Sequence, residues 1–345
     1  MGAIASDDAP SFREPAGAAP EVPATAFVTG GSGFIGGRLV ERLAGAGCRV
    51  RALARSDASA AAVERLGAES VRGDLGDPAS MRAGAGGCEA AFHLAAHLGQ
   101  WGTREEFVAG NVSGTQNALA AAREAGVRRF VHCGTEAALL AGEPLHHADE
   151  SAPLRPDSKA LYSSTKALAE LAVRDANRDG FETVVVRPRF VWGVGDTTLL
   201  PELAAMAESG KLAWIGGGTQ LTDITHVDNA VEGLLLAAQR GRGGEAYFVT
   251  DGEPVVFREF VSALLETQGV EPPTRSVPAW LAGPAAALSE TAWRVLPLGG
   301  EPPLTRFAFW ISSQECTIEI AKARAELGYE PLVSREQGLA ELSAR

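Results

Sequence analysis

The stretch Thr29-Gly-Gly-Ser-Gly-Phe-Ile-Gly36 follows the apolar run Ala26-Phe27-Val28 and leads into a helical pattern. A buried strand that breaks into glycines and then into a helix forms a pyrophosphate site, because N–H groups at the helix start face the anion. We expect Gly30 to allow the tight turn, Gly33 to admit phosphate without a Cβ, and Gly36 to let the helix pack on the sheet. Since 40 of the 345 residues are glycine, the spacing alone does not decide for a nucleotide site.

The composition is typical of a soluble globular protein of one or two domains, with 46% hydrophobic and 21% charged residues. The formal net charge of −12 disfavours binding to nucleic acid and to anionic membranes. No uninterrupted run of about 20 apolar residues is present, so we expect no transmembrane segment.

The four cysteines are scattered, with no CxxC pair and no histidine at zinc spacing. We therefore expect buried thiols rather than disulfides, and no metal site. The N-terminus has neither a basic head nor an apolar signal core, so a cytoplasmic protein is expected.

Strand and helix patterns alternate from residue 24 onward. Apolar runs predict strands at 26–28, 49–54, 70–72, 90–94, 129–133, 183–186 and 246–249. Helical patterns lie between them at 36–44, 58–66, 104–125, 159–177 and 227–239, and later at 257–268 and 317–327. This alternation predicts an α/β fold with a doubly wound parallel sheet, whose sites lie at the carboxyl ends of the strands.

The predicted domain organisation has a tail, a main domain and a smaller lobe. Residues 1–23 lack apolar periodicity and are expected to be disordered. A dinucleotide-binding Rossmann domain is expected over 24–188, with 226–250 returning to it. Glycine- and proline-rich loops with short apolar pieces predict a C-terminal substrate-binding lobe from 189–225 and 251–345.

The stretch Tyr162-Ser-Ser-Thr-Lys166 carries the second decisive pattern. At positions i and i+4 of a helix, Tyr162 and Lys166 emerge on one face. A nearby ammonium stabilises a phenolate, so such a pair can move a proton to or from a carbonyl or alcohol oxygen. Taken alone the pair could be two residues on a solvated helix face, but it follows the glycine-rich turn within a βαβ chain.

With these motifs the chain from residue 25 onward resembles the extended short-chain dehydrogenase/reductase superfamily. The glycine-rich turn and the YxxxK pair match its two signatures. Further matches, in chain order, are Asp74-Leu75, His93-Leu-Ala-Ala96, Asn111-Val-Ser-Gly-Thr115, Asp149-Glu-Ser-Ala-Pro153, Arg187-Pro188 and His226-Val-Asp-Asn-Ala230.

The resemblance implies roles for particular residues. Tyr162 would be the general acid/base, Lys166 would lower the pKa of that phenol and bind the nicotinamide ribose, and Thr135 would orient the substrate oxygen. Thr135 could instead be a strand-end cap, and Asn111 could serve a proton-relay water or be purely structural. The implied cofactor-binding residues are Gly30, Ser32, Gly33, Phe34, Ile35, Gly36, Arg55, Asp74, Leu75, Leu94, Ala95, Ala96, Asn111, Tyr162, Lys166 and Pro188.

The end of the second strand indicates whether the cofactor carries a 2′-phosphate. The strand ends in Ala54-Arg55, where NAD enzymes of this fold place an acidic residue on the ribose 2′-hydroxyl. A guanidinium matches a 2′-phosphate, so NADP(H) is favoured and NAD(H) stays possible, because Arg55 could also stack on adenine. Arg38, early in the phosphate-binding helix, is a further candidate for the same positive patch.

Short sequence motifs in the second half of the chain narrow the class of substrate. Arg187-Pro-Arg-Phe-Val-Trp-Gly193 and Asp223-Ile-Thr-His-Val-Asp-Asn229 resemble the 3β-hydroxysteroid dehydrogenase group, including its sterol-4α-carboxylate 3-dehydrogenase branch. Gln100-Trp-Gly102 and Pro303-Leu-Thr-Arg-Phe307 also resemble 2-alkyl-3-oxoalkanoate reductases. Both imply an NAD(P)-dependent oxidoreductase that interconverts a hydroxyl and a ketone on a large hydrophobic substrate, with the steroid-type activity placed first and β-keto acid reduction as the alternative.

Several side chains are candidates for contact with such a substrate, namely Trp101, Glu136, Phe190, Trp192 and His226. Arg189, Arg306 and His226 could hold a carboxylate, or could pair with structural acids. An apolar segment could form a lid over the substrate, and its residues are Trp280, Leu281, Leu288, Trp293, Val295, Leu296 and Leu298. Core packing is the first alternative for any single one of these residues. A shallow membrane-docking face is disfavoured by the acidic balance and the few basic residues there.

Two other functions fit the same fold. A nucleotide-sugar epimerase or dehydratase would need a polar and basic small lobe, whereas this one is apolar. A non-catalytic dinucleotide sensor would not need the intact Tyr162 and Lys166. Relatives often form dimers through the two helices that follow the fourth and fifth strands, so a homodimer is expected.

Overall fold

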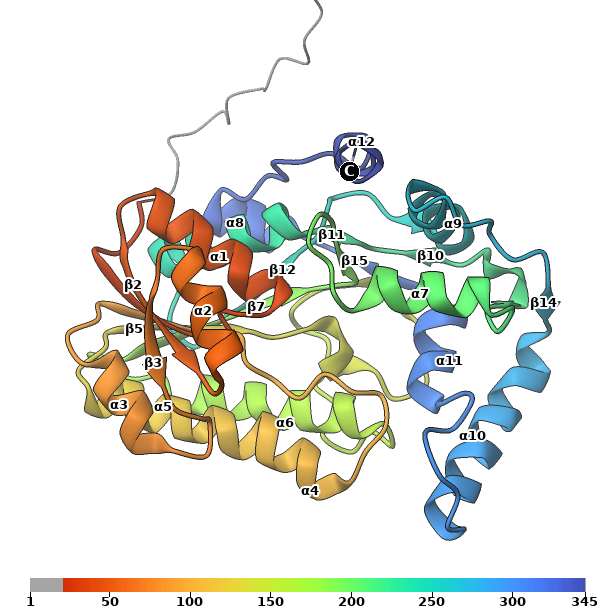
Figure 1. The fold of residues 1–345 in the computed structure, drawn as a ribbon, viewed down its shortest axis with the longest axis horizontal. Helices are drawn as coiled ribbons and strands as arrows, with labels where there is room; N and C mark the ends of the chain where they lie inside the picture. Colours follow the sequence, from red (N-terminus) through yellow and green to blue (C-terminus); the bar gives the residue numbers. More distant parts are fainter. Residues whose placement is uncertain (1–20, 345) are drawn as a thin grey trace, which may run out of the picture.

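A seven-stranded parallel sheet forms the centre of the protein (Figure 1), in a computed structural model that describes residues 21–344. Residues 1–20 of the predicted tail lie outside the described residues. The strand order is β12-β7-β5-β4-β1-β2-β3, with every neighbouring pair parallel. The strands are β1 (Thr25–Thr29), β2 (Arg49–Ala54), β3 (Glu69–Arg72), β4 (Ala90–His93), β5 (Arg129–Cys133), β7 (Glu182–Pro188) and β12 (Ala246–Val249). This confirms the predicted fold class.

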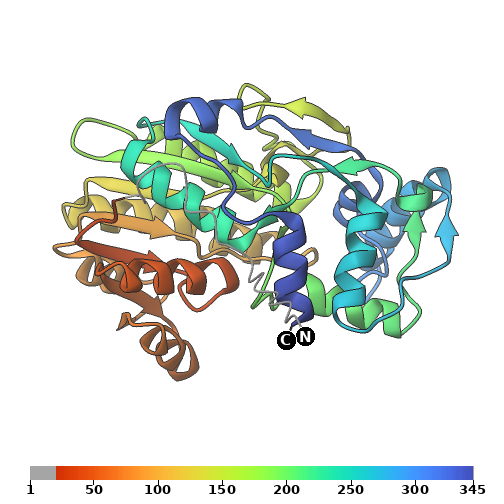
Figure 2. The same ribbon diagram turned by 90° about the horizontal axis from the view of Figure 1, so that it is seen from above.

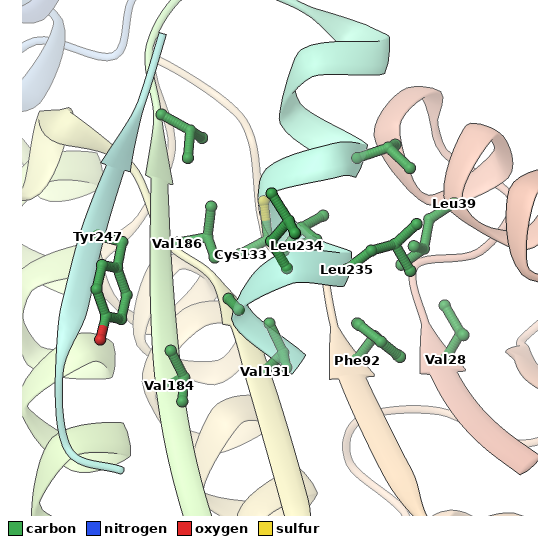
Figure 3. Close-up of a cluster of buried hydrophobic side chains, with 14 of the residues drawn as sticks. Val28, Leu39, Phe92, Val131, Cys133, Val184, Val186, Leu234, Leu235 and Tyr247 are labelled. Atoms are coloured by element: carbon green, nitrogen blue, oxygen red, sulfur yellow. The ribbon is translucent and has the colours of Figure 1, made fainter. Parts of the chain in front are cut away.

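Helices cover both faces of the sheet because successive strand side chains point to opposite faces. On one face, α1 (Phe34–Gly45) and α8 (Val227–Arg240) pack side by side. Figure 3 shows their leucines meeting apolar side chains of the central strands, including Val28, Phe92, Val131, Val184 and Val186. The intervening residues face the second layer, where Phe27 and Val185 meet α3 (Pro78–Ala85), α5 (Gly114–Glu124) and α6 (Leu161–Asp175). Helix α2 (Asp57–Arg65) packs on β2 and β3.

The helix expected over residues 104–125 contains a π-helical turn. It begins as α4 (Arg104–Phe107), widens at Val108–Ser113 and continues as α5. Asn111 lies in the wide turn with its side chain buried. A π-turn inside a helix redirects side chains by part of a turn, and here it directs Asn111 inward.

The smaller elements gather to one side of the sheet, as Figures 1 and 2 both show. The helices of this smaller part are α7 (Leu199–Glu208), α9 (Phe257–Thr267), α10 (Ala279–Val295) and α11 (Arg306–Ser313). Three short sheets accompany them, built from β13-β10-β15-β6, β11-β8 and β14-β9. These strands are β6 (Leu145–Ala148), β8 (Val191–Trp192), β9 (Trp214–Ile215), β10 (Leu221–Thr222), β11 (Thr225–His226), β13 (Val255–Val256), β14 (Ser276–Val277) and β15 (Cys316–Ile318).

The predicted helix over 317–327 is wrong in its first part. Residues Cys316–Ile318 form β15, which pairs with both β6 and β10. Two open strand edges and the β-branched Thr317 and Ile318 favour the extended form over the helical pattern. Helical structure follows and ends, as expected, at Gly328, whose φ of 67° is left-handed. A last helix, α12 (Arg335–Ser343), was not predicted.

Two further observations concern the described part of the chain. Cys48, Cys88, Cys133 and Cys316 are buried and unpaired. Within residues 21–344 no helix combines the length and apolar character required to cross a bilayer.

Candidate active site

The glycine-rich turn has the backbone geometry of an anion cradle. Gly30 has a φ of +76°, and a Cβ there would lie 2.6 Å from the Ala95 nitrogen. A Cβ on Gly36 would lie 2.0 Å from the Gly30 carbonyl oxygen. Helix α1 starts after Gly33 without a side-chain cap, and Ser32 and Gly33 are exposed, so the first N–H groups are free to meet phosphate. The turn therefore fits a dinucleotide pyrophosphate.

The other predicted cofactor residues lie at the same edge of the sheet, because each follows a parallel strand at its carboxyl end. Phe34 and Ile35 form the first turn of α1, half-buried. The remaining positions are Arg55 after β2, Asp74 and Leu75 after β3, Leu94, Ala95 and Ala96 after β4, and Pro188 at the end of β7. The structure thus brings this set together around the glycine-rich turn.

Arg38 is held elsewhere. Its guanidinium pairs with Asp228 of α8 at 2.6 Å and with Glu41 at 2.7 Å. Arg38 therefore ties α1 to α8 and does not extend the positive patch at Arg55, contrary to the suggestion from the sequence.

A buried hydrogen-bond chain links the turn to the π-helical segment. Thr115 Oγ1 donates its one proton to the Asn111 carbonyl oxygen at 2.6 Å. It must therefore accept a hydrogen bond from His93 Nε2, which lies 3.0 Å away. His93 Nδ1 then accepts from Thr29 Oγ1 at 2.7 Å. Burial, and secondarily Lys166, lower the pKa of His93 to about 3, so the ring is neutral. The sequence pattern contained His93 but did not reveal this role.

Asn111 supports the backbone. Its Oδ1 accepts from His97 N at 2.7 Å, and its Nδ2 donates to Thr165 Oγ1 in α6 at 3.1 Å and to the His97 carbonyl oxygen at 3.3 Å. The side-chain amide is thus occupied with holding the loop after β4 against α6. Of the two roles considered for Asn111, the structural one accounts for these bonds.

The three expected catalytic residues converge at the end of β5. Thr135 follows that strand and caps a 3-10 turn, Glu136–Leu139, by accepting from Ala137 N at 3.2 Å. Tyr162, half-buried in the first turn of α6, lies within hydrogen-bond reach of Thr135. Lys166, one turn further, is buried and donates to the Cys133 carbonyl oxygen at 3.1 Å.

The electrostatics of Tyr162 differ from the expectation. Burial raises the pKa of the phenol well above its usual range, and the Glu136 carboxylate and Cys133 raise that pKa further. Burial also lowers the pKa of Lys166. Helical spacing places Tyr162 and Lys166 on one face, but it could not show that the ammonium reaches the Cys133 carbonyl or that an acid faces the phenol.

Glu136 and two arginines were assigned to the substrate and are instead engaged within the protein. Glu136 Oε2 accepts from Thr135 Oγ1 at 2.8 Å, and its Oε1 accepts from Arg189 Nη1 at 2.5 Å. Arg306 forms an ion pair with the buried Glu290. These ion pairs fit the structural alternative for both arginines, because buried acids already neutralise them.

Trp192 and His226 also belong to the interior, which corrects their assignment to substrate contact. Trp192 Nε1 donates to Asp251 at 2.9 Å, and its ring meets the His226 ring edge-on at 5.0 Å. His226 caps α8 by accepting from Asp228 N at 3.3 Å. Burial lowers the pKa of His226 to about 4, so it is neutral at pH 7.

Phe190 and Trp101 keep partial exposure. Phe190 has a left-handed φ of 46°, which is strained for a bulky residue, and its ring meets Phe257 at 5.9 Å. Trp101 lies in the loop after β4, where Arg294 of α10 stacks over its ring at 5.1 Å. Both stay candidates for substrate contact.

Of the three alternatives for the apolar segment, ordinary core packing does not fit its most exposed residues. Trp280, Leu288 and Val295 are 72–75% exposed on α10, because that helix turns Ala282, Ala286 and Glu290 inward. The residue that covers the site comes from α11. The Phe307 ring packs edge-on against Tyr162 with ring centroids 5.3 Å apart.

Within residues 21–344 no group of three or more histidine, cysteine or acidic side chains is arranged to hold a metal ion.

The fold and the site together define a member of the extended short-chain dehydrogenase/reductase superfamily. Its features here are a doubly wound sheet, a glycine-rich turn that fits pyrophosphate, and a Thr-Tyr-Lys cluster beside that turn.

Comparison with known proteins narrows this class. The sequence profile of the 3-beta hydroxysteroid dehydrogenase/isomerase family matches residues 27–279. A 4-hydroxy-2-methyl-3-oxo-4-farnesyl-3,4-dihydroquinoline-1-oxide ketoreductase from Stigmatella aurantiaca is 46% identical, over 91% of this chain and 94% of that protein. A 2-alkyl-3-oxoalkanoate reductase from Stenotrophomonas maltophilia (strain K279a) is 38% identical, over 92% and 98%.

Among solved structures, DesIV, a dTDP-glucose 4,6-dehydratase from Streptomyces venezuelae determined with NAD and TYD bound, is similar, with a TM-score of 0.72. It is 26% identical and the match covers 93% of this chain and 96% of that one. The chain belongs to the 3-beta hydroxysteroid dehydrogenase/isomerase family. It is an oxidoreductase that acts between hydroxyl and keto groups.

Gly36→Ala is expected to abolish dinucleotide binding, because its Cβ would have to displace the Gly30 carbonyl by more than an ångström. Fluorescence titration with NADPH and with NADH measures the loss. Gly45→Ala, at the end of the same helix, is the matched control, since a Cβ there meets nothing within 4 Å. NADPH affinity equal to wild type in Gly36→Ala would contradict the assignment of the cradle.

Proposed function

We propose that the protein is an NADPH-dependent ketoreductase that reduces a 3-oxo group on a large apolar substrate in the cytoplasm. The observation that carries this proposal is the contact between Thr135, just after β5, and Tyr162 of α6, whose buried phenol has a raised pKa and lies against Phe307. The two curated relatives described above are both named as reductases of ketones, which supports the reductive direction. Four unpaired thiols suit a reducing compartment.

The nicotinamide cofactor would supply the hydride when bound. Tyr162 would donate its proton to the ketone oxygen, and it is suited to do so because burial keeps the phenol protonated at neutral pH. Lys166, anchored on the Cys133 carbonyl, would hold a ribose hydroxyl with its remaining N–H groups. Phe307, Trp101 and Phe190 would contact the apolar body of the substrate, with 189–225 and 251–345 as the substrate-binding lobe.

A 3β-hydroxysteroid dehydrogenase is the second candidate, favoured by the family profile. It would use the same residues in the oxidative direction, with Tyr162 accepting the proton. The substrate that is turned over distinguishes the two candidates. Reduction of a 2-alkyl-3-oxo acid or an aromatic ketone with NADPH would support the ketoreductase, and oxidation of a 3β-hydroxysteroid with NAD⁺ would support the dehydrogenase. A nucleotide-sugar substrate is disfavoured, because Arg189 and Arg306 are already neutralised by buried acids.

The preference for NADP(H) rests on two arginines at one edge of the sheet. Arg55 follows β2 and is exposed. Arg72, which the sequence analysis did not consider, lies opposite Ala54 in the β2–β3 pairing and is also exposed, with only a solvent-facing contact to Asp57 at 3.3 Å. Two guanidiniums beside the adenosine ribose would attract a 2′-phosphate.

A homodimer through α5 and α6 is also proposed. The two helices contact each other on one face of the molecule, and Leu171 of α6 is 43% exposed there. The half-buried Leu168 and Ala172 lie beside it on the helix surface. Two copies packed along this face would bury these apolar groups.

Tyr162→Phe is expected to lower kcat for ketone reduction by about 10²–10⁴-fold, because the proton donor is lost. NADPH affinity should stay within about twofold of wild type, since the ring is kept. Tyr247→Phe is the control, because its hydroxyl bonds to Glu326 and to the Arg242 backbone N–H and not to Thr135 or Lys166. Wild-type turnover by Tyr162→Phe would refute the proposed mechanism.

Arg55→Asp is expected to raise KM for NADPH by about tenfold or more and to leave or lower that for NADH, since a carboxylate repels the 2′-phosphate. Initial-rate kinetics with both cofactors measure the switch. The control is Arg49→Asp, an exposed arginine at the opposite end of the same strand. An unchanged NADPH/NADH ratio in Arg55→Asp would argue for adenine stacking.

Leu171→Glu is expected to halve the particle mass measured by light scattering after size-exclusion chromatography, because two buried carboxylates would face each other across the interface. Leu221→Glu, another exposed leucine at 39% exposure in the smaller lobe, should leave the mass unchanged. A monomeric wild-type protein would rule out the proposed dimer.

A further inference from the structure

We propose that Glu136 is a positioning residue that accepts the hydrogen bond of the Thr135 hydroxyl and fixes a negative charge beside Tyr162, which sets the site for proton donation. The inference rests on the proposed function for its meaning in turnover, but its geometry is independent of that function. It assigns to Glu136 a role that differs from the substrate contact expected from the sequence.

The position of Glu136 is determined on both carboxylate oxygens. Its side chain is nearly buried, with Oε2 accepting from Thr135 and Oε1 from Arg189. Arg189 is held in turn by Thr222, whose Oγ1 accepts from Nε at 2.9 Å, and by Thr225, whose Oγ1 accepts from the backbone N–H at 3.0 Å. A buried carboxylate with a paired guanidinium and a hydroxyl donor is held in one orientation.

This arrangement decides what Thr135 can do. A threonine hydroxyl has one proton and two lone pairs. The proton is directed to Glu136 at 2.8 Å and one lone pair accepts from Ala137 N at 3.2 Å. The lone pair that is left can accept from the phenol or from a product alcohol. While Glu136 is charged, Tyr162 is therefore the hydroxyl that gives a proton to the ketone.

The charge environment of the phenol is uneven. Tyr162 faces Glu136 and Cys133, and the Phe307 ring covers it from α11. Burial raises the pKa of Cys133 to about 11, so that thiol is neutral at pH 7. Lys166 directs its ammonium to the Cys133 carbonyl oxygen. Among these groups, Glu136 is the carboxylate whose charge raises the pKa of Tyr162.

The groups behind Glu136 do not reverse this effect. Arg189 compensates the carboxylate, and Asp223, whose pKa burial raises to about 6, contributes a second acid beside that guanidinium. Burial raises the pKa of Cys316 to about 12, so its thiol is neutral. Asp223 Oδ1 and Arg189 Nη2 have no hydrogen-bond partner among residues 21–344, so the two groups are not locked into a direct pair.

Glu136→Gln tests the inference, because it keeps the shape and removes the charge. Removing a negative charge makes phenolate formation easier, so the pKa of Tyr162 should fall, by about one unit or more. Tyrosinate absorbance of the cofactor-free protein measures this directly, since the chain has only three tyrosines and Tyr162→Phe gives the background. The alkaline limb of the pH profile of kcat for ketone reduction should move to lower pH by the same amount.

Glu136→Asp is the matched control. It keeps the charge, so the alkaline limb should stay in place while the shorter side chain loosens Thr135 and lowers kcat. If Glu136→Gln does not fold, the double variant Glu136→Gln/Arg189→Met removes both charges without leaving a buried cation. A smaller downward shift of the Tyr162 pKa is then expected, because the cation behind the carboxylate is lost as well.

The inference would be overturned if Glu136→Gln folds but keeps the tyrosinate midpoint and the pH profile of the wild-type protein. This holds even if its kcat is lower, because lost packing alone lowers kcat without moving a pKa. Failure of the wild-type protein to reduce any ketone would instead count against the proposed function. The tyrosinate titration would still decide on Glu136 in that case.

Discussion

The close approach of Gly36 to the Gly30 carbonyl is the constraint on which the rest of the site depends. With no side chain at either residue, α1 starts directly above the turn, and the turn lies against the backbone of Leu94 and Ala95. That contact fixes the loop after β4 relative to β1. From there the bonds of Thr29, His93, Thr115 and Asn111 continue to α6, which carries Tyr162 and Lys166. The glycine-rich cradle and the proposed proton donor are thus parts of one connected hydrogen-bond network.

Buried polar groups hold that network together, and each hydrogen-bond partner offsets the free-energy cost of removing such a group from water. A neutral histidine between two hydroxyls satisfies its hydrogen bonds without carrying charge, and an isolated ion there would cost several kcal/mol. The Glu136–Arg189 pair is the charged counterpart. Each network fixes a backbone segment that meets the phenol, so the geometry of the reaction centre depends on groups that do not touch the substrate.

The sequence predicted the parts of this site that are local. Hydrophobic alternation and the β-branched run 183–186 predicted the parallel sheet, and the glycine spacing predicted the cradle, because both depend on neighbours within a few residues. The Glu136–Arg189 contact joins residues 53 apart, and the pairing of Lys166 with Cys133 depends on how deeply α6 packs on β5. No periodicity encodes either one. Residues 316–318 were misassigned for a related reason, since their strand exists only through two partners distant in the chain.

The small lobe shows why composition identified the lid segment but not its working face. The stretch 279–295 is apolar on more than one side, and only the packing of Ala282 and Ala286 against α11 decides which side is turned inward. Small residues at those positions let the two helices approach closely, and α11 then presents Phe307 to Tyr162. An apolar ring over the phenol and an acid behind it act in the same direction, since each disfavours the phenolate. Desolvation from the lobe and charge from the sheet edge together bias Tyr162 towards giving its proton rather than taking one.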